Sequence, residues 1–259
     1  MSRGSRLIEY ELRRALELQE FNLLFQPQID ISTGAISSVE ALLRWNNSKL
    51  GTVPPDKFIS VAEETTLINP IGDWVLVTAC EYLKQIRERG HRNIVMSVNI
   101  SIIQLMQQNF TQRVLEVLGQ MCIPPQYLEL EMTESMLIES YDVIREKVLE
   151  LRSYGIKIAL DDFGKGYSSL SHLNNIPINT LKIDKTFIDT INGEEDVISL
   201  TGMIIMIGHR LGMRIVAEGV EREEQFKYLQ KHQYNKIQGY YFSKPLPCNE
   251  LSVLLSQML

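Results

Sequence analysis

The sequence predicts an α/β fold, a modified (β/α)8 TIM-like barrel with an antiparallel first strand, and three observations indicate it. The 259 residues are about the usual length of such a barrel. After residue 45, strand-like apolar runs alternate with helix-like segments, which is typical of βα units around a mostly parallel sheet. Before that point, runs at 22–31 and 35–45 are joined only by Ser32, Thr33 and Gly34. So short a joint predicts an antiparallel hairpin, because parallel strands need a longer crossover.

Each further element follows from its residue pattern. Residues 7–20 carry apolar side chains at helical spacing and predict an amphipathic helix, while residues 1–6 are set aside as a linker, so that 7–259 forms one domain. Pro54-Pro55-Asp56 starts one helix, and 71–89 forms another that ends at Gly90. The remaining expected strands are 94–100, 127–132, 156–161, 180–184, 214–217 and 236–238, and expected helices are 141–154, 195–211 and 221–232. With the hairpin, this makes about eight strands, which suits a closed barrel.

Composition limits the class of function. Hydrophobic residues make up 44% of the chain and charged residues 22%, as in an ordinary globular domain. The net charge of −6 argues against non-specific nucleic-acid binding. Three cysteines lie far apart without a C-x-x-C pair, which predicts a reducing compartment such as the cytoplasm and argues against a thiolate metal site.

Polar side chains follow or end the predicted strands. They are Glu40, Asn99, Glu131, Asp161, Asp162, Lys182, Glu218 and Gln238. Carboxylates that lie together repel one another and must protonate or share a cation. Because the strand ends of a barrel meet at one face, the pattern predicts oxygen ligands around divalent metal at its mouth.

Some of these residues also fit a purely structural role. Asp161 and Asp162 precede Gly164 and Gly166, a pattern that also suits an Asp-rich turn. Asn99 could offer a carbonyl oxygen to a hard cation or only satisfy a turn.

On two predicted strands, the sequence does not determine whether charged side chains point into the barrel or outward. Alternation places Glu129 and Glu131 on one face of their strand, either as inward groups or as an exposed pair, and exposure remains open above all for Glu129. Lys182 could point inward, where carboxylates would keep it charged, or outward beside a helix.

Motifs over essentially all of 7–259 resemble those of the EAL family, bacterial phosphodiesterases that open cyclic di-GMP to linear pGpG. Residues 40–45, EALLRW, resemble the signature of this family. The resemblance continues through FQP (25–27), SVNIS (97–101), EMTE (131–134), DDFGKGYSSL (161–170), LKID (181–184), AEGVE (217–221) and QGY (238–240). It implies the modified barrel that the hairpin also predicts.

The resemblance also implies residue roles. One Mg²⁺ or Mn²⁺ would be bound by Glu40, Asn99, Glu131 and Asp161. Asp161 would bridge to a second ion with Asp162 beside it. The implied catalytic residues are Lys182 to position water, Glu218 as base or water-mediated ligand, and Glu134 to anchor the loop after Asp162. Substrate would be held by Gln26, Leu43, Arg44 and Gln238, with Glu221 supporting the site. Ca²⁺ should inhibit, because it prefers longer bonds and more ligands than Mg²⁺.

The same resemblance implies cyclic di-GMP as substrate, a homodimer, and an upstream sensory or GGDEF domain in a longer protein, which could be anchored to a membrane. The chain departs from the family at Lys165, where a threonine is usual, and this concerns the loop that couples metal binding to dimerisation. A catalytically silent EAL domain that binds cyclic di-GMP or a protein partner is the alternative, and a missing ligand would mark it. None is missing. An unrelated Mg²⁺ barrel enzyme, such as an enolase-like lyase, would need a carbon-acid base beside the metals.

Overall fold

A computed structural model describes residues 3–164, 173, 175–191 and 200–257. Within these residues one sheet of nine strands is formed, and eight of them close into a barrel because β1 also pairs with β2. In barrel order these are β1 (Phe21–Asp30), β9 (Lys236–Ile237), β8 (Arg214–Ala217), β7 (Thr180–Ile183), β6 (Lys157–Phe163), β5 (Leu128–Thr133), β4 (Val95–Asn99) and β2 (Ile36–Asn47). The ninth strand, β3 (Gly51–Val53), extends the hairpin by pairing with the end of β2.

The first strand runs against both of its neighbours. β1 pairs antiparallel with β2, with Gln26 opposite Glu40, and antiparallel with β9. The six other contacts around the barrel, from β2 through β4 to β9, are parallel. The predicted modified barrel with an antiparallel first strand is therefore confirmed.

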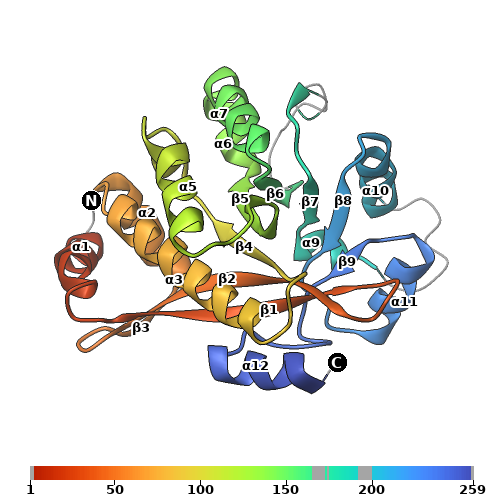
Figure 1. Cartoon of the computed structure of the whole chain (residues 1–259), viewed down its shortest axis with the longest axis horizontal. Coiled ribbons are helices and arrows are strands. Elements are labelled where there is room, and N and C mark those ends of the chain that lie inside the picture. The colour runs from red at the N-terminus through yellow and green to blue at the C-terminus, as the bar shows by residue number, and fades with distance from the viewer. Residues whose placement is uncertain (1–2, 165–172, 174, 192–199, 258–259) are drawn as a thin grey trace.

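Helices surround this barrel (Figure 1). Their bounds are α1 (Arg3–Ala15), α2 (Pro55–Glu64), α3 (Ile68–Glu88), α4 (Ile102–Leu105), α5 (Phe110–Gln120), α6 (Glu134–Glu139), α7 (Tyr141–Ser153), α9 (Lys185–Ile188), α10 (Leu200–Arg210), α11 (Glu223–Lys231) and α12 (Cys248–Gln257), with a 3-10 turn at Pro125–Tyr127. The helix expected at 7–20 starts earlier, so that it includes residues 3–6, and ends earlier, since the chain leaves the helix in a turn where Gln19 has φ +54°. Of the helix expected at 195–211, residues 195–199 lie outside the described residues.

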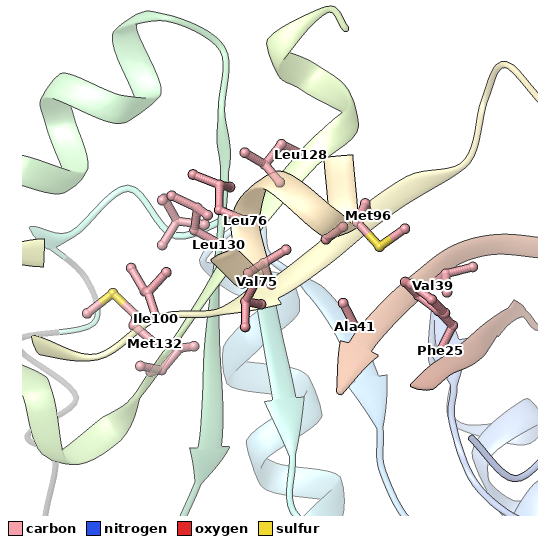
Figure 2. Close-up of a cluster of buried hydrophobic side chains, with 14 of the residues drawn as sticks. Phe25, Val39, Ala41, Val75, Leu76, Met96, Ile100, Leu128, Leu130 and Met132 are labelled. Carbon is pink, nitrogen blue, oxygen red and sulfur yellow. The ribbon is translucent and has the colours of Figure 1, made fainter. Parts of the chain in front are cut away.

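Side chains alternate between two buried faces along the barrel strands. The outward face is apolar: Figure 2 shows Leu128 and Leu130 of β5 and Val39 of β2 in one cluster with Val75 and Leu76 of α3. The residues between them, such as Glu40 and Glu129, point to the other face, as expected from the period of two. The apolar packing between strands and helices thus stabilises the barrel and leaves its interior to other side chains.

The barrel interior is polar, whereas branched apolar side chains usually fill it. Lys182 on β7 reaches Glu40 on β2, and Thr180 on β7 reaches Glu129 on β5. These strands are not neighbours, so the contacts cross the interior. Lys182 is 1% exposed and Glu129 is 3% exposed. The outward alternative for Lys182 and the exposed alternative for Glu129 are therefore wrong.

The part of the chain that the structure describes has no helix with the length and apolar character needed to cross a membrane.

Candidate metal centre

Each strand of the barrel contributes one polar residue to a single layer of the interior. Six of these residues lie within their strands and two, Glu218 and Gln238, directly follow β8 and β9. The layer consists of Gln26, Glu40, Asn99, Glu131, Asp161, Lys182, Glu218 and Gln238, which are linked by hydrogen bonds and ion pairs. Seven of the eight strand-end residues predicted from the sequence are in this layer, and the eighth, Asp162, directly follows Asp161.

Lys182 lies at the centre of this layer. Its Nζ is 2.6 Å from Glu131 Oε2, 2.8 Å from Glu218 Oε1, 3.3 Å from Asp161 Oδ2 and 3.4 Å from Glu40 Oε2. Burial alone lowers the pKa of Lys182, but the four carboxylates outweigh it and raise this pKa well above its ordinary value. The ammonium therefore stays charged and partly neutralises the acids around it.

The carboxylates are held in an environment that disfavours their charge. Burial, with Glu40 and Asp161 nearby, raises the pKa of Glu131 well above its ordinary value, although Lys182 opposes this. Burial, with Asp161 and Glu40 nearby, likewise raises the pKa of Glu218 against the effect of Lys182. The second oxygen of Glu131, Oε1, is buried and has no hydrogen-bond partner among the described residues. An orphaned carboxylate oxygen among acids fits a cation ligand.

Two groups of carboxylates are close enough to hold divalent ions, and they share Asp161. Oxygens of Glu40, Glu131 and Asp161 lie within 4.8 Å of one another, and so do oxygens of Asp161, Asp162 and Glu218. These are hard ligands, as Mg²⁺ and Mn²⁺ prefer. The shared residue, Asp161, is the one for which the family resemblance implied a bridge between two ions.

Asn99 lies beside the first of these groups. Its Nδ2 donates to Glu40 Oε1 at 2.8 Å, and its side chain is otherwise exposed at the barrel mouth. Because Nδ2 donates to Glu40, the carbonyl oxygen is the atom of this amide that would serve as a ligand to a divalent ion.

Two residues at the end of β6 have backbone conformations that favour glycine. Asp162 has φ +56°, in the left-handed region, and its amide donates to Asp161 Oδ1 at 2.8 Å. Gly164 has φ +102°, and a Cβ there would lie 2.3 Å from the Phe187 ring. Glu134 Oε2 accepts from the Gly164 amide at 2.8 Å, so Glu134 contacts the start of the loop that it was expected to anchor. Gly166 and Lys165 lie outside the described residues.

A cavity of about 470 Å³ lies beside the layer and is lined in part by Leu43, Arg44 and Asn99. Its volume is in the range of small-molecule sites, roughly 300–1,000 Å³. Arg44 is half-buried, and burial lowers its pKa while Tyr240 and Glu40 oppose this. Within the described residues its guanidinium makes one hydrogen bond, to the Leu43 carbonyl at 2.9 Å, so most of its donors remain for a ligand.

Gln26 and Glu221, which were also predicted as site residues, lie in different places. Gln26 accepts from Gln238 Nε2 at 3.0 Å, and its own Nε2 donates to the Ser243 carbonyl at 3.2 Å, so Gln26 belongs to the layer. Glu221 instead bonds Lys185 at the surface and is 44% exposed. The structure does not bring Glu221 into the layer.

A second polar layer lies beneath the first and was not predicted from the sequence. It contains Gln28, Ser38, Ser97, Glu129, Thr180 and Lys236, all buried. Each of these residues stands two positions from a residue of the first layer on the same strand. The period of two along strands is the signal that could have indicated them.

Known proteins match this chain over most of its length. The family model described as EAL domain matches residues 9–245. The chain is 38% identical over 248 residues to the oxygen sensor protein DosP of Escherichia coli, covering 96% of this chain and 31% of DosP. It is 35% identical to the cyclic di-GMP phosphodiesterase NbdA of Pseudomonas aeruginosa, covering 96% of this chain and 32% of NbdA. The chain thus spans about a third of the length of these relatives.

A solved structure has the same architecture. The phosphodiesterase of MucR from Pseudomonas aeruginosa, in complex with c-di-GMP, superposes with a TM-score of 0.89 at 36% identity, over 95% of this chain and 99% of that one.

Proposed function

The chain belongs to the EAL domain family, and from this we propose that it hydrolyses cyclic di-GMP to linear pGpG with two divalent ions, Mg²⁺ or Mn²⁺. The observation that carries the proposal is the pair of acidic groups that share Asp161 around the buried Lys182. The names of NbdA and of the MucR structure support the substrate, since they refer to cyclic di-GMP.

The proposed metal ligands are the residues of the two acidic groups. Glu40, Glu131 and Asp161, with the carbonyl oxygen of Asn99, would hold one ion, and Asp161 and Asp162, with Glu218 through water, would hold the other. When bound, such ions lower the pKa of water toward about 7 and neutralise charge on phosphate oxygens.

The protein's own groups then position the water and accept its proton. Lys182 donates to Glu131 and lies 2.8 Å from Glu218, so these two contacts hold its ammonium in one position. It would orient the attacking water and offset charge that develops on the phosphate. Glu218 would accept the proton, because its carboxylate lies beside the ammonium that orients the water.

Substrate would be held beside the layer. Arg44 would donate from its guanidinium to a phosphate, and Leu43 would line the apolar part of the cavity of about 470 Å³. Gln26 would offer the second hydrogen of its amide group from the layer itself. Gln238, whose NH₂ group already donates to Gln26 and Glu40, would contribute its carbonyl oxygen, and Glu134 would hold the loop after Asp162. Glu221 would act only indirectly, through Lys185.

We also propose that residues 7–259 act as one domain of a longer protein with an upstream sensory or GGDEF domain, and that two copies pair. The share of DosP and NbdA that the chain spans supports further domains. All three cysteines are free, which agrees with the reducing cytoplasm where a cyclic dinucleotide signal would act.

Turnover of cyclic di-GMP in Mg²⁺, Mn²⁺, Ca²⁺ and EDTA, followed by chromatography of the products, tests the proposal. We expect pGpG in Mg²⁺ and Mn²⁺, none in EDTA, and inhibition when Ca²⁺ is added to Mg²⁺. Intact substrate after long incubation with Mn²⁺, together with tight binding, would instead identify a silent receptor. Equal rates in Ca²⁺ and Mg²⁺ would contradict a two-metal site that demands a defined geometry.

A further inference from the structure

A hydrogen-bonded chain of buried side chains runs through the barrel interior and ends on Glu40. Lys236 Nζ donates to Ser38 Oγ at 2.7 Å, and Ser38 Oγ donates to Gln28 Oε1 at 2.6 Å. Gln28 Nε2 donates to Gln238 Oε1 at 2.9 Å, and Gln238 Nε2 donates to Glu40 Oε2 at 2.6 Å. All five side chains are buried. Four successive donors therefore point in one direction, from the second layer toward a proposed metal ligand.

The strand register produces this chain. Gln28 on β1 is paired with Ser38 on β2, and Lys236 at the start of β9 stands two residues before Gln238. Because alternate residues of a strand share a face, these positions point into the interior together with Glu40. Buried polar groups require hydrogen-bond partners, and here each partner leads one step closer to the first layer.

The direction of the donors matters because a glutamine amide has two unlike ends. Gln238 could offer Glu40 its NH₂ group, which attracts a carboxylate, or its carbonyl oxygen, which repels one. The lysine ammonium has three donors and no acceptor, so Lys236 requires the Ser38 oxygen to accept and leaves its hydroxyl to donate onward. Burial lowers the pKa of Lys236, and the nearby Glu129 opposes this effect. Lys236 thus acts on the orientation of Gln238 through three hydrogen bonds, together with Gln26 Oε1, which accepts from Gln238 Nε2 at 3.0 Å.

We propose that Lys236, Ser38 and Gln28 are positioning residues that act through Gln238 to orient Glu40 for a divalent ion. This inference rests on the metal site of the proposed function. Loss of an outer hydrogen-bond partner of a metal ligand commonly weakens metal binding about 10–100-fold. The three residues do not touch the ion in this scheme, so their effect is on the orientation of its ligand.

Matched substitutions separate positioning from general packing. Ser38→Ala removes one buried hydroxyl from the chain, and Lys236→Met removes its first donor. Thr180→Val is the control, since Thr180 is also buried in the interior but its hydroxyl donates to Glu129 Oε1 at 2.6 Å, a contact outside this chain. The Kd for Mn²⁺ of each folded protein is measured by isothermal titration calorimetry, and the unfolding midpoint in EDTA is measured alongside.

We expect about tenfold weaker Mn²⁺ binding in Ser38→Ala and Lys236→Met, and wild-type binding in Thr180→Val. Wild-type affinity in both chain variants, or an equal loss in Thr180→Val, would overturn the positioning role. So would failure of both chain variants to fold while Thr180→Val folds, because the network would then be a requirement of folding. If the wild-type protein binds no Mn²⁺, the proposed function falls too, whereas wild-type binding with unchanged variants removes this inference alone.

Discussion

Lys182 Nζ lies 2.6 Å from Glu131 Oε2, although their strands, β7 and β5, are separated by β6 in the barrel. The contact therefore crosses the interior, and it places one positive charge where several carboxylates converge. One ammonium does not balance that many acids. The remaining negative charge would favour the binding of divalent cations in this layer.

Replacing Lys182 with methionine should destabilise the metal-free protein by about 3–5 kcal/mol, because buried carboxylates would lose their positive partner. Mn²⁺ should restore part of the loss, since a cation that binds the folded cluster shifts the equilibrium toward the folded state. Urea unfolding in EDTA and in Mn²⁺ measures both effects.

The control for this variant is Lys227→Met, because Lys227 pairs with Glu223 on the exposed face of α11. A surface pair of this kind contributes at most about 1 kcal/mol. If metal-free Lys182→Met were as stable as the wild-type protein, Lys182 would not be the charge that neutralises the cluster.

The metal-free protein should lose stability as the pH rises from about 4.3, the pKa of an unfolded glutamate, towards neutral. The pKa values of Glu131 and Glu218 are raised by burial and like charge, while an unfolded glutamate titrates at about 4.3. A raised carboxyl pKa contributes stability that is complete below the unfolded pKa and is lost as the pH rises through the folded pKa. The contribution of Lys182, whose pKa is also raised, is complete below its unfolded pKa of about 10.4, so it stays constant in this window.

Unfolding midpoints in EDTA at several pH values check this prediction, and Glu218→Gln, which removes one titrating group, should flatten the slope. Mn²⁺ affinity should rise over the same window, because the ligands bind in their deprotonated form. Metal-free stability that increases over this window would contradict the raised pKa values.

The barrel and its first polar layer could be predicted because several sequence signals agree. The short joint between the first two strands requires an antiparallel hairpin, and polar residues at strand ends such as Glu131 and Asp161 interrupt apolar runs. Parallel strands of a barrel end at one face, so these residues had to converge there.

The second polar layer could not be predicted as readily, for a physical reason. Both faces of a barrel strand are buried, but alternation only places Glu129 and Leu130 on opposite faces and does not state which face points into the barrel. Exposure was therefore a fair alternative for Glu129, and its contact with Thr180 across the barrel excludes it. Helices α5 and α12 were not among the expected helices, and the early end of α1 depends on the turn at Gln19, which propensity does not require.

Glu40→Ala should abolish turnover and weaken Mn²⁺ binding, because Glu40 is a proposed ligand that also accepts hydrogen bonds from Asn99 and Gln238. Folding should survive, since relief of carboxylate repulsion offsets part of the lost hydrogen bonding. Calorimetry and turnover assays measure the two effects, and Glu88→Ala on the exposed face of α3 is the control. Near-wild-type turnover in Glu40→Ala would remove Glu40 from the ligand set.

Arg44→Ala and Glu218→Gln should affect different steps. Arg44 is expected on a phosphate, and hydrogen bonds to charged groups contribute about 1.5–3 kcal/mol, so Arg44→Ala should weaken cyclic di-GMP binding about tenfold or more. Glu218→Gln should leave binding nearly unchanged and lower the single-turnover rate about 10²–10⁴-fold, as expected for loss of a general base. Lys182→Ala should resemble Glu218→Gln in this respect, since both groups contact each other and are assigned to the water.

Binding measured in Ca²⁺, which is not expected to support hydrolysis, and single-turnover rates at saturating substrate in Mg²⁺ separate the two steps. The geometry makes the distinction sharp, because Arg44 lines the cavity beside the layer whereas Glu218 contacts Lys182 inside it. If Arg44→Ala bound normally but failed to hydrolyse, while Lys182→Ala lost binding, the assignment of recognition to the cavity and of chemistry to the layer would have to be reversed.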